Sequence, residues 1–367
     1  MTTPSWKQMT RGVFVGLKRE EPNRYNTEQL QVITSDYSKH LGSGSFGHVY
    51  KGILDDGREV AVKVLKNTTL SATNDQFKAE VSTLCNHHQN LVKLYGFCSE
   101  SDKKALVYEF MENGSLDNIL YGNQSIKFEM LWKIAIGTAN GLSYLHHSCQ
   151  PSIIHYDIKP ANILLDANFY PKIGDFGLAK LLEKDTTHVT VSNFRGTGKY
   201  AAPELSLPWV SDLKGTHKSD VYSYGKLLYE LCYRCLGQDW WDRFENGQEE
   251  WLMNSCGIEG QDREKVKRIF KTANECMTFK PQLRPSMSDV VTLLEGTELG
   301  MPIDSSSATV IASFTSHNMQ AASSSSIAHN RIELAILSLK MHCRLLKLTK
   351  RQKWCKSHPF IFIYNNE

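Results

Sequence analysis

The chain has 367 residues, of which 22% are charged and 41% are hydrophobic. This composition is ordinary for a globular protein, and the length allows two lobes or domains. The formal charge of +3 is unevenly spread, because residues 301–367 hold eight Lys or Arg against three Asp or Glu and residues 1–300 therefore carry about −2. The body of the chain thus has no broad basic bias, which excludes a typical nucleic-acid-binding protein.

The chain has nine cysteines and no signal peptide ahead of them. This pattern indicates reduced thiols in a cytosolic compartment, and we expect no disulfides. Cys232 and Cys235 form a lone C-x-x-C, but the apolar spacing of VYSYGKLLYELCYRC favours a buried helix over a metal or redox role. No stretch approaches the ~20 apolar residues that a membrane-crossing helix needs.

Residues 1–37 are polar and weakly patterned, and we interpret them as a juxtamembrane-like leader with a short helix near NTEQLQVIT. Strand-like alternation then appears in HVYKGIL and REVAVKVL, and the DDG between them predicts a hairpin turn. The segment NDQFKAEVSTLCNH predicts a helix with Phe77, Val81 and Leu84 on one face. LVKLYGFC and KALVYEFM predict two buried strands, so this part is a small sheet with one helix.

Longer helical patterns follow ENGSLDNIL, such as MLWKIAIGTANGLSYLHHSC and SDVYSYGKLLYELCY, and they predict a mainly α-helical second lobe. We interpret residues 298–330 as a Ser-rich flexible linker and residues 331–367 as a basic tail. Basic and apolar residues recur in that tail at helical spacing: Lys340, Arg344, Lys347 and Arg351 beside Leu337, Met341, Leu345 and Leu348. An amphipathic helix on an anionic membrane is one interpretation, and an unpacked or aberrantly spliced tail is the favoured one.

The stretch LGSGSFGHV places Gly42, Gly44 and Gly47 in a strand–turn–strand, where backbone amides can approach phosphate oxygens without a side-chain clash. A glycine-rich turn alone is usually only a turn. AVKVL follows, however, and puts Lys63 on a strand that should pass beneath the turn. A lysine in an apolar strand is costly unless it is paired, so we expect Glu80 as its partner; the alternative is a surface lysine and a surface glutamate.

HYDIKPAN supplies Asp157, Lys159 and Asn162 within six residues, and DFG at 175–177 follows thirteen residues later. Phosphoryl transfer from ATP needs groups of these types. A carboxylate orients the hydroxyl, a lysine balances the transferring charge, and an Asn and an Asp offer the oxygen ligands that suit Mg²⁺. In this order and spacing the signal is strong.

Together these motifs resemble the eukaryotic protein kinase family over about residues 38–297. The resemblance implies an α+β bilobal fold, with an antiparallel sheet and one helix in an N-lobe of about 38–108 and a mainly helical C-lobe of about 112–297. ATP and Mg²⁺ would bind between the lobes. The implied nucleotide contacts are Leu41, Gly42, Ser43, Gly44, Ser45, Phe46, Gly47, His48, Val49, Ala61, Lys63, Glu80, Glu109 and Met111.

The same resemblance implies the roles of the charged residues. Asp157 would be the catalytic base, Lys159 would contact the γ-phosphate, and Asn162 and Asp175 would hold Mg²⁺. Lys63 would contact the α- and β-phosphates with Glu80 as its anchor. The remaining landmarks are AAPE at 201–204 at the end of the activation segment, Tyr108 as the gatekeeper, Asp220 as the support of the catalytic loop and Arg284 as the partner of Glu204.

Lys159 in DIKPAN and Thr197 in GTGKYAAPE resemble the pattern of non-specific Ser/Thr protein kinases. LGSGSFGHVYKG, LVKLYGFC and LVYEFMENGSL further resemble plant receptor-like kinases of the rust-resistance, lectin and wall-associated-type branch. We therefore expect protein substrates with Ser or Thr, receptor-complex partners and no nucleic acid. We expect a cytoplasmic kinase part without ectodomain, touching a membrane only through the basic tail or through a missing N-terminal span.

A pseudokinase-like scaffold with little turnover is the rival from another class. It is disfavoured because such proteins generally lose a residue matching Lys63, Asp157 or Asp175, all of which this chain keeps. A small-molecule kinase is disfavoured by AAPE, which shapes a peptide site.

The sequence departs from the family at three places. Lys199 stands where a glycine is usual, and CYRCLGQDWWDRFENG is shorter than in relatives, both on the expected peptide-docking side. Tyr156 replaces the arginine that usually precedes the catalytic Asp and meets an activation-segment phosphate. The simple interpretation is that Tyr156 only packs against the loop. A phosphate in this segment would then lack its usual receptor, although Lys180 and Arg195 could substitute; the candidate sites are Thr186, Thr187, Thr190 and Ser192.

Overall fold

The structure is a computed structural model, and it describes residues 22–44, 47–66, 70–84, 87–100, 103–122, 126–182, 189–190, 196–206 and 214–296. These residues all belong to one compact unit, Met1–Leu299. Residues 1–21 of the leader, the whole linker at 298–330 and the tail at 331–367 lie outside the described residues, so the division of the chain into leader, kinase domain, linker and tail stays a prediction.

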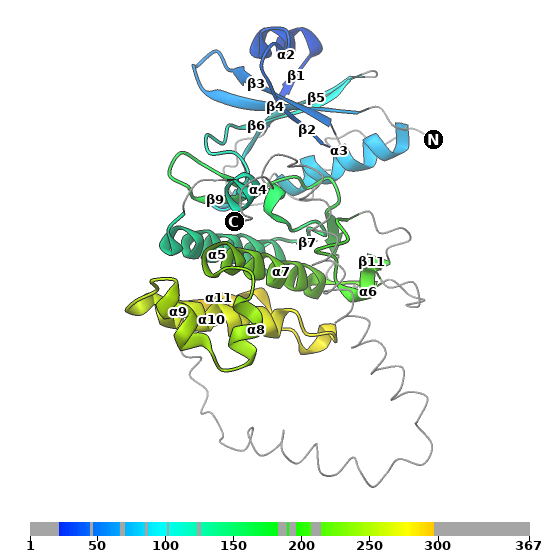
Figure 1. Ribbon diagram of the computed structural model, residues 1–367. Coiled ribbons are helices and arrows are strands. Elements are labelled where there is room, and N and C mark those ends of the chain that lie inside the picture. Colours follow the sequence, from blue (N-terminus) through cyan, green and yellow to red (C-terminus); the bar gives the residue numbers. More distant parts are fainter. Residues whose placement is uncertain are drawn as a thin grey trace, which may run out of the picture. The chain divides into compact units, whose positions relative to one another are not determined.

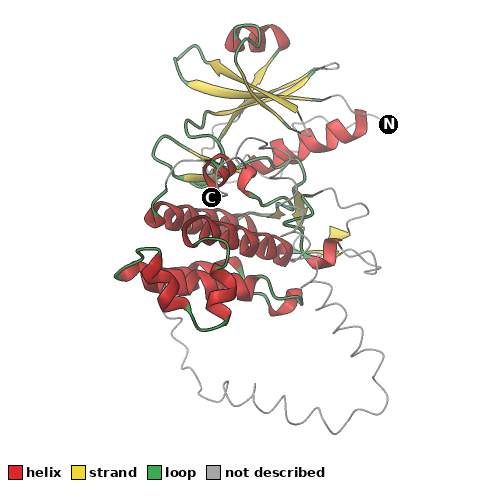
Figure 2. Cartoon of the chain, viewed as in Figure 1, coloured by secondary structure: helices red, strands yellow, loops and turns green. Residues whose placement is uncertain are grey.

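A six-stranded sheet forms the N-lobe, with the strand order β1-β5-β6-β4-β3-β2. Figure 2 shows its strands in yellow above the mainly helical part of the chain. The strands are β1 (Asn23–Tyr25), β2 (His40–Ser43), β3 (Gly47–Ile53), β4 (Glu59–Leu65), β5 (Leu94–Ser99) and β6 (Lys104–Glu109). All neighbours are antiparallel except β1 and β5, which run parallel. Gly57 has φ +84° in the turn between β3 and β4, so the hairpin predicted from DDG is present.

The short helix expected near NTEQLQVIT is present, and it packs on the sheet. Helix α2 (Thr27–Thr34) begins with a capping box made by Asn26 and Gln29, and it buries Leu30 and Ile33 against the outer face of the sheet. The preceding strand β1 crosses so close to Gly96 that a Cβ there would clash with the Tyr25 ring. The polar composition concealed this packing because α2 buries only one narrow face.

Helix α3 (Leu70–Leu84) lies on the other side of the sheet from α2 (Figure 1). It begins earlier than the helix expected over NDQFKAEVSTLCNH and is described as far as Leu84, whose side chain is outside the described part. Phe77 packs edge-on against Phe97 of β5, with ring centroids 5.8 Å apart. Glu80, one helical turn further on, is completely buried.

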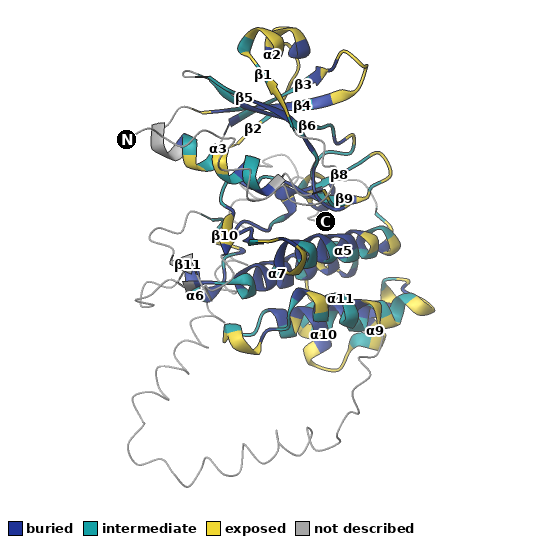
Figure 3. Ribbon diagram, turned by 180° about the vertical axis from the view of Figure 1, so that it is seen from behind, coloured by how far each residue is buried: buried dark blue, intermediate teal, exposed yellow. Residues whose placement is uncertain are grey.

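The C-lobe is mainly helical, as expected, which together with the sheet gives the bilobal α+β fold. Its helices are α4 (Leu116–Tyr121), α5 (Phe128–Ser143), α6 (Pro203–Ser206), α7 (His217–Leu236), α8 (Trp240–Glu245), α9 (Glu249–Ser255), α10 (Gln261–Cys276) and α11 (Met287–Glu295), with a π-helical turn η1 (Tyr144–Ser148) after α5 and a 3-10 turn η3 (Pro281–Leu283) before α11. Helices α5 and α7 are the most buried, and α9 lies at the surface (Figure 3). Cys232 and Cys235 are free thiols on α7, so the helix interpretation of C-x-x-C is confirmed.

The loop-rich part of the chain between α5 and α7 contains short strands. They are β7 (Ser152–Ile154), β8 (Ile163–Leu165), β9 (Pro171–Ile173), β10 (Lys180–Leu182), β11 (Val189–Thr190) and β12 (Lys214–Gly215). The β8–β9 hairpin and the β7–β10 pair bring residues 155–162, which include the 3-10 turn η2 (Pro160–Asn162), beside residues 174–177. No helix among the described residues is long and apolar enough to span a bilayer. The described part also contains no cluster of three or more His, Cys, Asp or Glu side chains that would hold a metal by themselves.

Candidate active site

Lys63 on β4 joins two carboxylates from distant parts of the chain. Its Nζ lies 2.7 Å from Oε1 of Glu80 on α3 and 2.7 Å from Oδ1 of Asp175, which follows β9. Burial disfavours the charge on Lys63, but Asp175 and Glu80 more than compensate and raise its pKa above the ordinary value. The predicted pairing with Glu80 is therefore present, and the alternative of two surface residues is wrong.

Asp175 itself is also held in its charged form. Burial opposes ionisation, but the Lys63 ammonium lowers the pKa of Asp175 below its ordinary value. Its backbone has φ +59°, a left-handed conformation that is uncommon for a residue with a side chain. The neighbouring Phe176 is completely buried in the core.

Asp157 is the centre of the second charged group. Its Oδ1 accepts hydrogen bonds from the Thr197 backbone N–H at 3.1 Å and from the Thr197 hydroxyl at 2.8 Å. Its Oδ2 accepts from Lys159 Nζ at 2.5 Å and from Asn162 Nδ2 at 3.1 Å. Lys159 Nζ also donates to the Thr197 hydroxyl at 2.9 Å. The catalytic-loop residues and the activation segment therefore meet at one carboxylate.

Asn162 and Asp175, the two candidate Mg²⁺ ligands, are connected through the backbone. The Gly174 N–H donates to the Asn162 carbonyl at 2.9 Å, and Ile163 pairs with Ile173 in the β8–β9 hairpin. Asn162 uses Nδ2 for its bonds to Asp157, so the ligand that its side chain can offer is Oδ1. An amide oxygen and a carboxylate are suitable donors for Mg²⁺, so these residues fit that ion.

The glycine-rich turn lies between β2 and β3. The Gly44 N–H donates to the Gly47 carbonyl at 2.9 Å, and a Cβ at Gly47 would clash with the Val64 carbonyl of β4. A Cβ at Gly42 or Gly44 would meet no described atom, so the space on that side of both residues is open. The Gly44 carbonyl accepts a hydrogen bond from Lys66 Nζ at 2.8 Å. His48 Nδ1 and His40 Nε2 both lie 2.8 Å from the Ser43 hydroxyl, which joins the two strands at the base of the turn.

The other predicted nucleotide contacts follow from the sheet register. Val49 pairs with Lys63, Ala61 pairs with Tyr108, and Leu41 is exposed on β2. Ser45 and Phe46 lie outside the described residues. At the end of β6 the Glu109 N–H donates to the Lys93 carbonyl at 3.0 Å, and the Met111 carbonyl accepts from the Gly114 N–H at 3.1 Å.

Asp220 of α7 supports the catalytic loop from below. Its carboxylate is completely buried and accepts the backbone N–H groups of His155 and Tyr156, each at 2.8 Å, and Nε2 of His146 at 2.9 Å. Burial opposes its charge, but these donors lower the pKa of Asp220 below its ordinary value. His155 in turn donates from Nε2 to the Gly174 carbonyl at 3.1 Å, which ties the loop to the residue before Asp175.

Tyr156 is buried in a small apolar cluster with Ile154, Leu182, Ala202, Leu205 and Tyr222. Its φ is +65°, and a Cβ at Gly215 would clash with its hydroxyl. Within the described part of the chain this hydroxyl has no hydrogen-bond partner. Burial raises its pKa, and the nearby Asp220 and Glu204 charges add to that shift. The simple interpretation, that Tyr156 packs beside the loop, agrees with this position.

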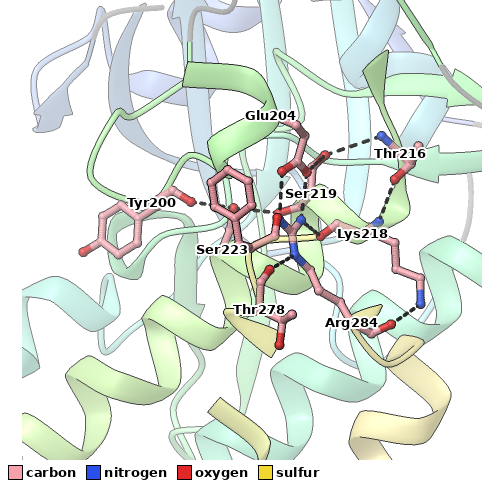
Figure 4. A network of polar contacts seen from close by, with 9 residues as sticks. Tyr200, Glu204, Thr216, Lys218, Ser219, Ser223, Thr278 and Arg284 are labelled. Carbon is pink, nitrogen blue, oxygen red and sulfur yellow. Dashed lines mark hydrogen bonds and ion pairs between the residues drawn. The ribbon is translucent and has the colours of Figure 1, made fainter. Parts of the chain in front are cut away.

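The end of the activation segment is anchored by Glu204 of α6 and Arg284. The pair is bidentate, with NH1–Oε1 and NH2–Oε2 distances of 2.8 Å each (Figure 4). Arg284 is completely buried and also donates to the carbonyls of Thr278, Lys218 and Phe279. Every nitrogen of its guanidinium thus has a partner, which a buried charge requires.

Two contacts of the site were not expected from the sequence. The Tyr108 hydroxyl donates to Oε2 of Glu80, and Lys199 forms an ion pair with Glu230 of α7. The sequence identifies Tyr108 only as the gatekeeper and Lys199 only as a departure from the family. The partners lie 28 and 31 residues apart in the sequence, and no local spacing signal connects them.

A two-lobed fold that gathers a paired lysine, a DFG carboxylate and a buttressed catalytic-loop carboxylate defines the protein-kinase class. The family model of protein tyrosine and serine/threonine kinases matches residues 36–294, and the chain belongs to that family. A protein kinase domain uses ATP as phosphoryl donor, typically with Mg²⁺.

Named relatives come from plants. The chain is 43% identical, over 77% of its own length and 36% of the relative, to a G-type lectin S-receptor-like serine/threonine-protein kinase of Arabidopsis thaliana. It is 41% identical, over 74% of its length and 45% of the relative, to the leaf rust 10 disease-resistance locus receptor-like protein kinase-like 2.1 of Arabidopsis thaliana. It is 40% identical, over 75% of its length and 46% of the relative, to the rust resistance kinase Lr10 of Triticum aestivum. The chain therefore spans less than half of each of these relatives.

Proposed function

We propose that the chain is a serine/threonine protein kinase that transfers the γ-phosphoryl group of ATP to protein hydroxyls. The arrangement around Asp157 is the observation that carries the proposal. Its carboxylate accepts hydrogen bonds from Thr197, Lys159 and Asn162. Lys63, on strand β4 of the sheet, forms an ion pair with Asp175. Phosphoryl transfer depends mainly on positioning and electrostatic stabilisation, and these are the groups that would provide both.

The donor side would be built from the N-lobe and the DFG segment. Gly42, Gly44 and Gly47 would cover the phosphates. At Gly42 and Gly44 the space that a Cβ would fill is open, which leaves room for phosphate oxygens. Lys63 would contact the α- and β-phosphates, and Asn162 and Asp175 would hold Mg²⁺, which neutralises phosphate charge. For the adenine we propose the Glu109 carbonyl and the Met111 N–H, because the Glu109 N–H and the Met111 carbonyl already bond within the protein.

On the acceptor side, Asp157 would accept the proton of the substrate hydroxyl as that oxygen attacks the γ-phosphorus. Lys159 would balance the charge on the transferring group. The contact between Thr197 and both of these residues supports serine or threonine as the acceptor, as does the wording of the relatives' names. The leaving group is ADP, and the proton passes from the acceptor to Asp157, so the step balances without another reactant.

A pseudokinase-like scaffold is the alternative. Nothing in the described site favours it, because Lys63, Asp157 and Asp175 are present and each is held by charged or polar partners. A scaffold would bind ATP without turning it over.

For its place in the cell we propose receptor-like signalling on the cytoplasmic side of a membrane, with receptor-complex partners and protein substrates. The names of the relatives support this setting. Any membrane contact would come from the basic residues 331–367 or from a span preceding this sequence.

Incubation of the purified chain with Mg²⁺–ATP, followed by mass spectrometry of the phosphorylated residues, tests the function. We expect phosphate on Ser and Thr and release of ADP. Nucleotide binding without phosphate transfer to the chain or to a generic protein substrate would favour the scaffold, and phosphate confined to Tyr would contradict the acceptor class.

A further inference from the structure

A buried carboxylate lies close to the expected position of the substrate peptide. Glu230 of α7 has only 9% of its side chain exposed, and it faces Lys199, which follows Thr197 by two residues. Because Thr197 bonds directly to Asp157, and two residues of extended chain span about 7 Å at most, Lys199 lies within reach of the residues flanking the phosphoacceptor.

Three donors occupy the Glu230 carboxylate. Lys199 Nζ pairs with Oε1, while the hydroxyls of Tyr121 and Tyr200 both donate to Oε2, that of Tyr200 at 2.8 Å. Lys199 Nζ lies 3.3 Å from the Tyr121 hydroxyl and 3.4 Å from the Tyr200 hydroxyl. Helix α4, the activation segment and α7 thus each contribute a side chain to one closed cluster.

The charges in this cluster balance. Burial opposes the ionisation of Glu230, but the Lys199 ammonium and the two hydroxyls lower the pKa of Glu230 below its ordinary value. Burial likewise opposes the charge of Lys199, yet Glu230 raises the pKa of Lys199. The pair therefore stays ionised and mutually neutralised. Without Lys199, a partly buried negative charge with only two neutral donors would remain.

The cluster nevertheless reaches the surface. A third of the Lys199 side chain is exposed, and Tyr121 is 59% exposed, whereas Tyr200 is buried. A substrate side chain that passed over α4 would meet Tyr121 and Lys199 first. A substrate Lys or Arg that approached Glu230 would therefore meet the like charge of Lys199.

We propose that Lys199 is a specificity-determining residue that occupies Glu230 and thereby excludes Lys and Arg from the substrate positions next to the phosphoacceptor. The inference rests on the proposed protein kinase function and adds the charge class of its substrates. Neutral or acidic residues are accepted at these positions, because the closed cluster presents no unpaired carboxylate. Replacing Lys199 by an uncharged residue opens the carboxylate to a basic substrate residue.

The test compares a neutral Ser peptide with a set of peptides that carry a single Arg at each position within about three residues of the Ser. For the wild-type chain we expect kcat/KM to be lower for peptides whose Arg falls near the cluster than for the neutral peptide. For Lys199→Met the ratio of kcat/KM between the best Arg peptide and the neutral peptide rises about tenfold or more, as one added charge-assisted contact predicts. The double variant Lys199→Met, Glu230→Gln loses this gain, because the carboxylate is then absent.

Lys133→Met is the matched control, since Lys133 pairs with Glu129 on the exposed surface of α5 and its replacement leaves the ratio unchanged. Lys199→Gln gives a second, polar replacement if Lys199→Met does not fold. A wild-type preference for Arg beside the acceptor, or an unchanged ratio in both Lys199 variants, overturns the inference.

Binding of fluorescently labelled Arg and neutral peptides, measured by polarisation without ATP, separates the two proposals. A gain in Arg-peptide binding on loss of Lys199, without any phosphate transfer, refutes the kinase function and keeps the charge selection. Phosphate transfer with no change in the kcat/KM ratio or in the ratio of Arg-peptide to neutral-peptide binding refutes the charge selection and keeps the kinase function.

Discussion

Tyr108 donates a hydrogen bond from its hydroxyl to Oε2 of Glu80, while Oε1 of the same carboxylate accepts from Lys63 at 2.7 Å. Both partners are buried, and Glu80 has no exposed surface. Burial, reinforced by the Glu80 charge, raises the pKa of Tyr108 well above its ordinary value, so the hydroxyl stays a neutral donor. Strand β6, which carries Tyr108, is therefore connected to helix α3, whose Glu80 pairs with Lys63.

Replacing Tyr108 by Phe removes this donor from a buried carboxylate. We expect the free energy of unfolding to fall by about 1–3 kcal/mol, the usual cost for a buried charged acceptor that loses a partner. Urea denaturation measures the change. Tyr50→Phe removes a hydroxyl from β3, away from Glu80, and should change the stability by less than about 0.5 kcal/mol. Equal stability of the two variants would show that the Tyr108 contact contributes nothing.

Replacing Lys63 or Asp157 by Ala should abolish autophosphorylation. In the proposed mechanism each variant loses a group aimed at developing charge or at the attacking hydroxyl, and losses on the order of a hundredfold or more are typical of such groups. Radiolabel incorporation from ATP measures the effect, and circular dichroism verifies that the fold remains. Lys133→Ala on α5 serves as the control. Near wild-type turnover in either variant would refute the role assigned to that residue.

Arg284→Ala should destabilise the C-lobe strongly. It removes the cation from Glu204 and the guanidinium donors from the carbonyls of Thr278, Lys218 and Phe279, and breaking a buried pair costs about 3–5 kcal/mol. Urea denaturation again gives the value. Arg58→Ala, which breaks a pair with Asp56 on the exposed β3–β4 turn, should change the stability little. If the two arginine variants were equally stable, the burial of the Arg284–Glu204 pair would have no energetic consequence.

His217 gives the fold a pH dependence. Burial, reinforced by His146, lowers the pKa of His217 to about 4, although Asp220 acts in the opposite direction. The unfolded chain titrates near 6.5, so between pH 6.5 and 4 it binds more protons than the folded chain, and stability falls as the pH falls. After allowance for the partial exposure of His217, this group accounts for about 1–2 kcal/mol.

The variant His217→Gln lacks this proton uptake. The loss of unfolding free energy between pH 7 and 4.5 should therefore be smaller in the variant than in the wild type by about that amount. Other groups contribute equally to both proteins and cancel in the difference. Identical pH profiles would contradict the assignment.

Tyr156 predicts that basal activity does not depend strongly on activation-segment phosphorylation. The residue that usually supplies a cation for such a phosphate is here a buried, uncharged ring against Gly215. The four sites in question are Thr186, Thr187, Thr190 and Ser192, of which only the backbone of Thr190 is in the described part. Replacing all four by Ala should reduce phosphorylation of an exogenous peptide by less than roughly tenfold. A loss of a hundredfold or more, restored by acidic replacements, would show that the segment still acts as a switch.

Much of the fold could be predicted because its signals are local. The alternation of HVYKGIL and REVAVKVL, the turn at DDG and the helical spacing around Phe77 are set by neighbouring residues, and each produced the expected element. The residues of the candidate site could also be identified from the sequence, since glycines, a lysine, two aspartates and an asparagine at this spacing rarely occur together outside phosphoryl-transfer sites. The packing of α2 on the sheet was not predicted, because Leu30 and Ile33 give too short an apolar pattern.

The sequence by itself determined which chemical groups are present, including the complete set around Asp157 and the substitution at Tyr156. It also indicated the pairs Lys63–Glu80 and Glu204–Arg284, whereas only the tertiary structure showed the partners of Glu230 and the second donor to Glu80. Glu230 receives Lys199 and Tyr200 from the activation segment and Tyr121 from α4, and Glu80 receives Tyr108 from β6. A buried charge is stable only when it is paired, and the pairing depends on which distant elements the packing of the core brings together.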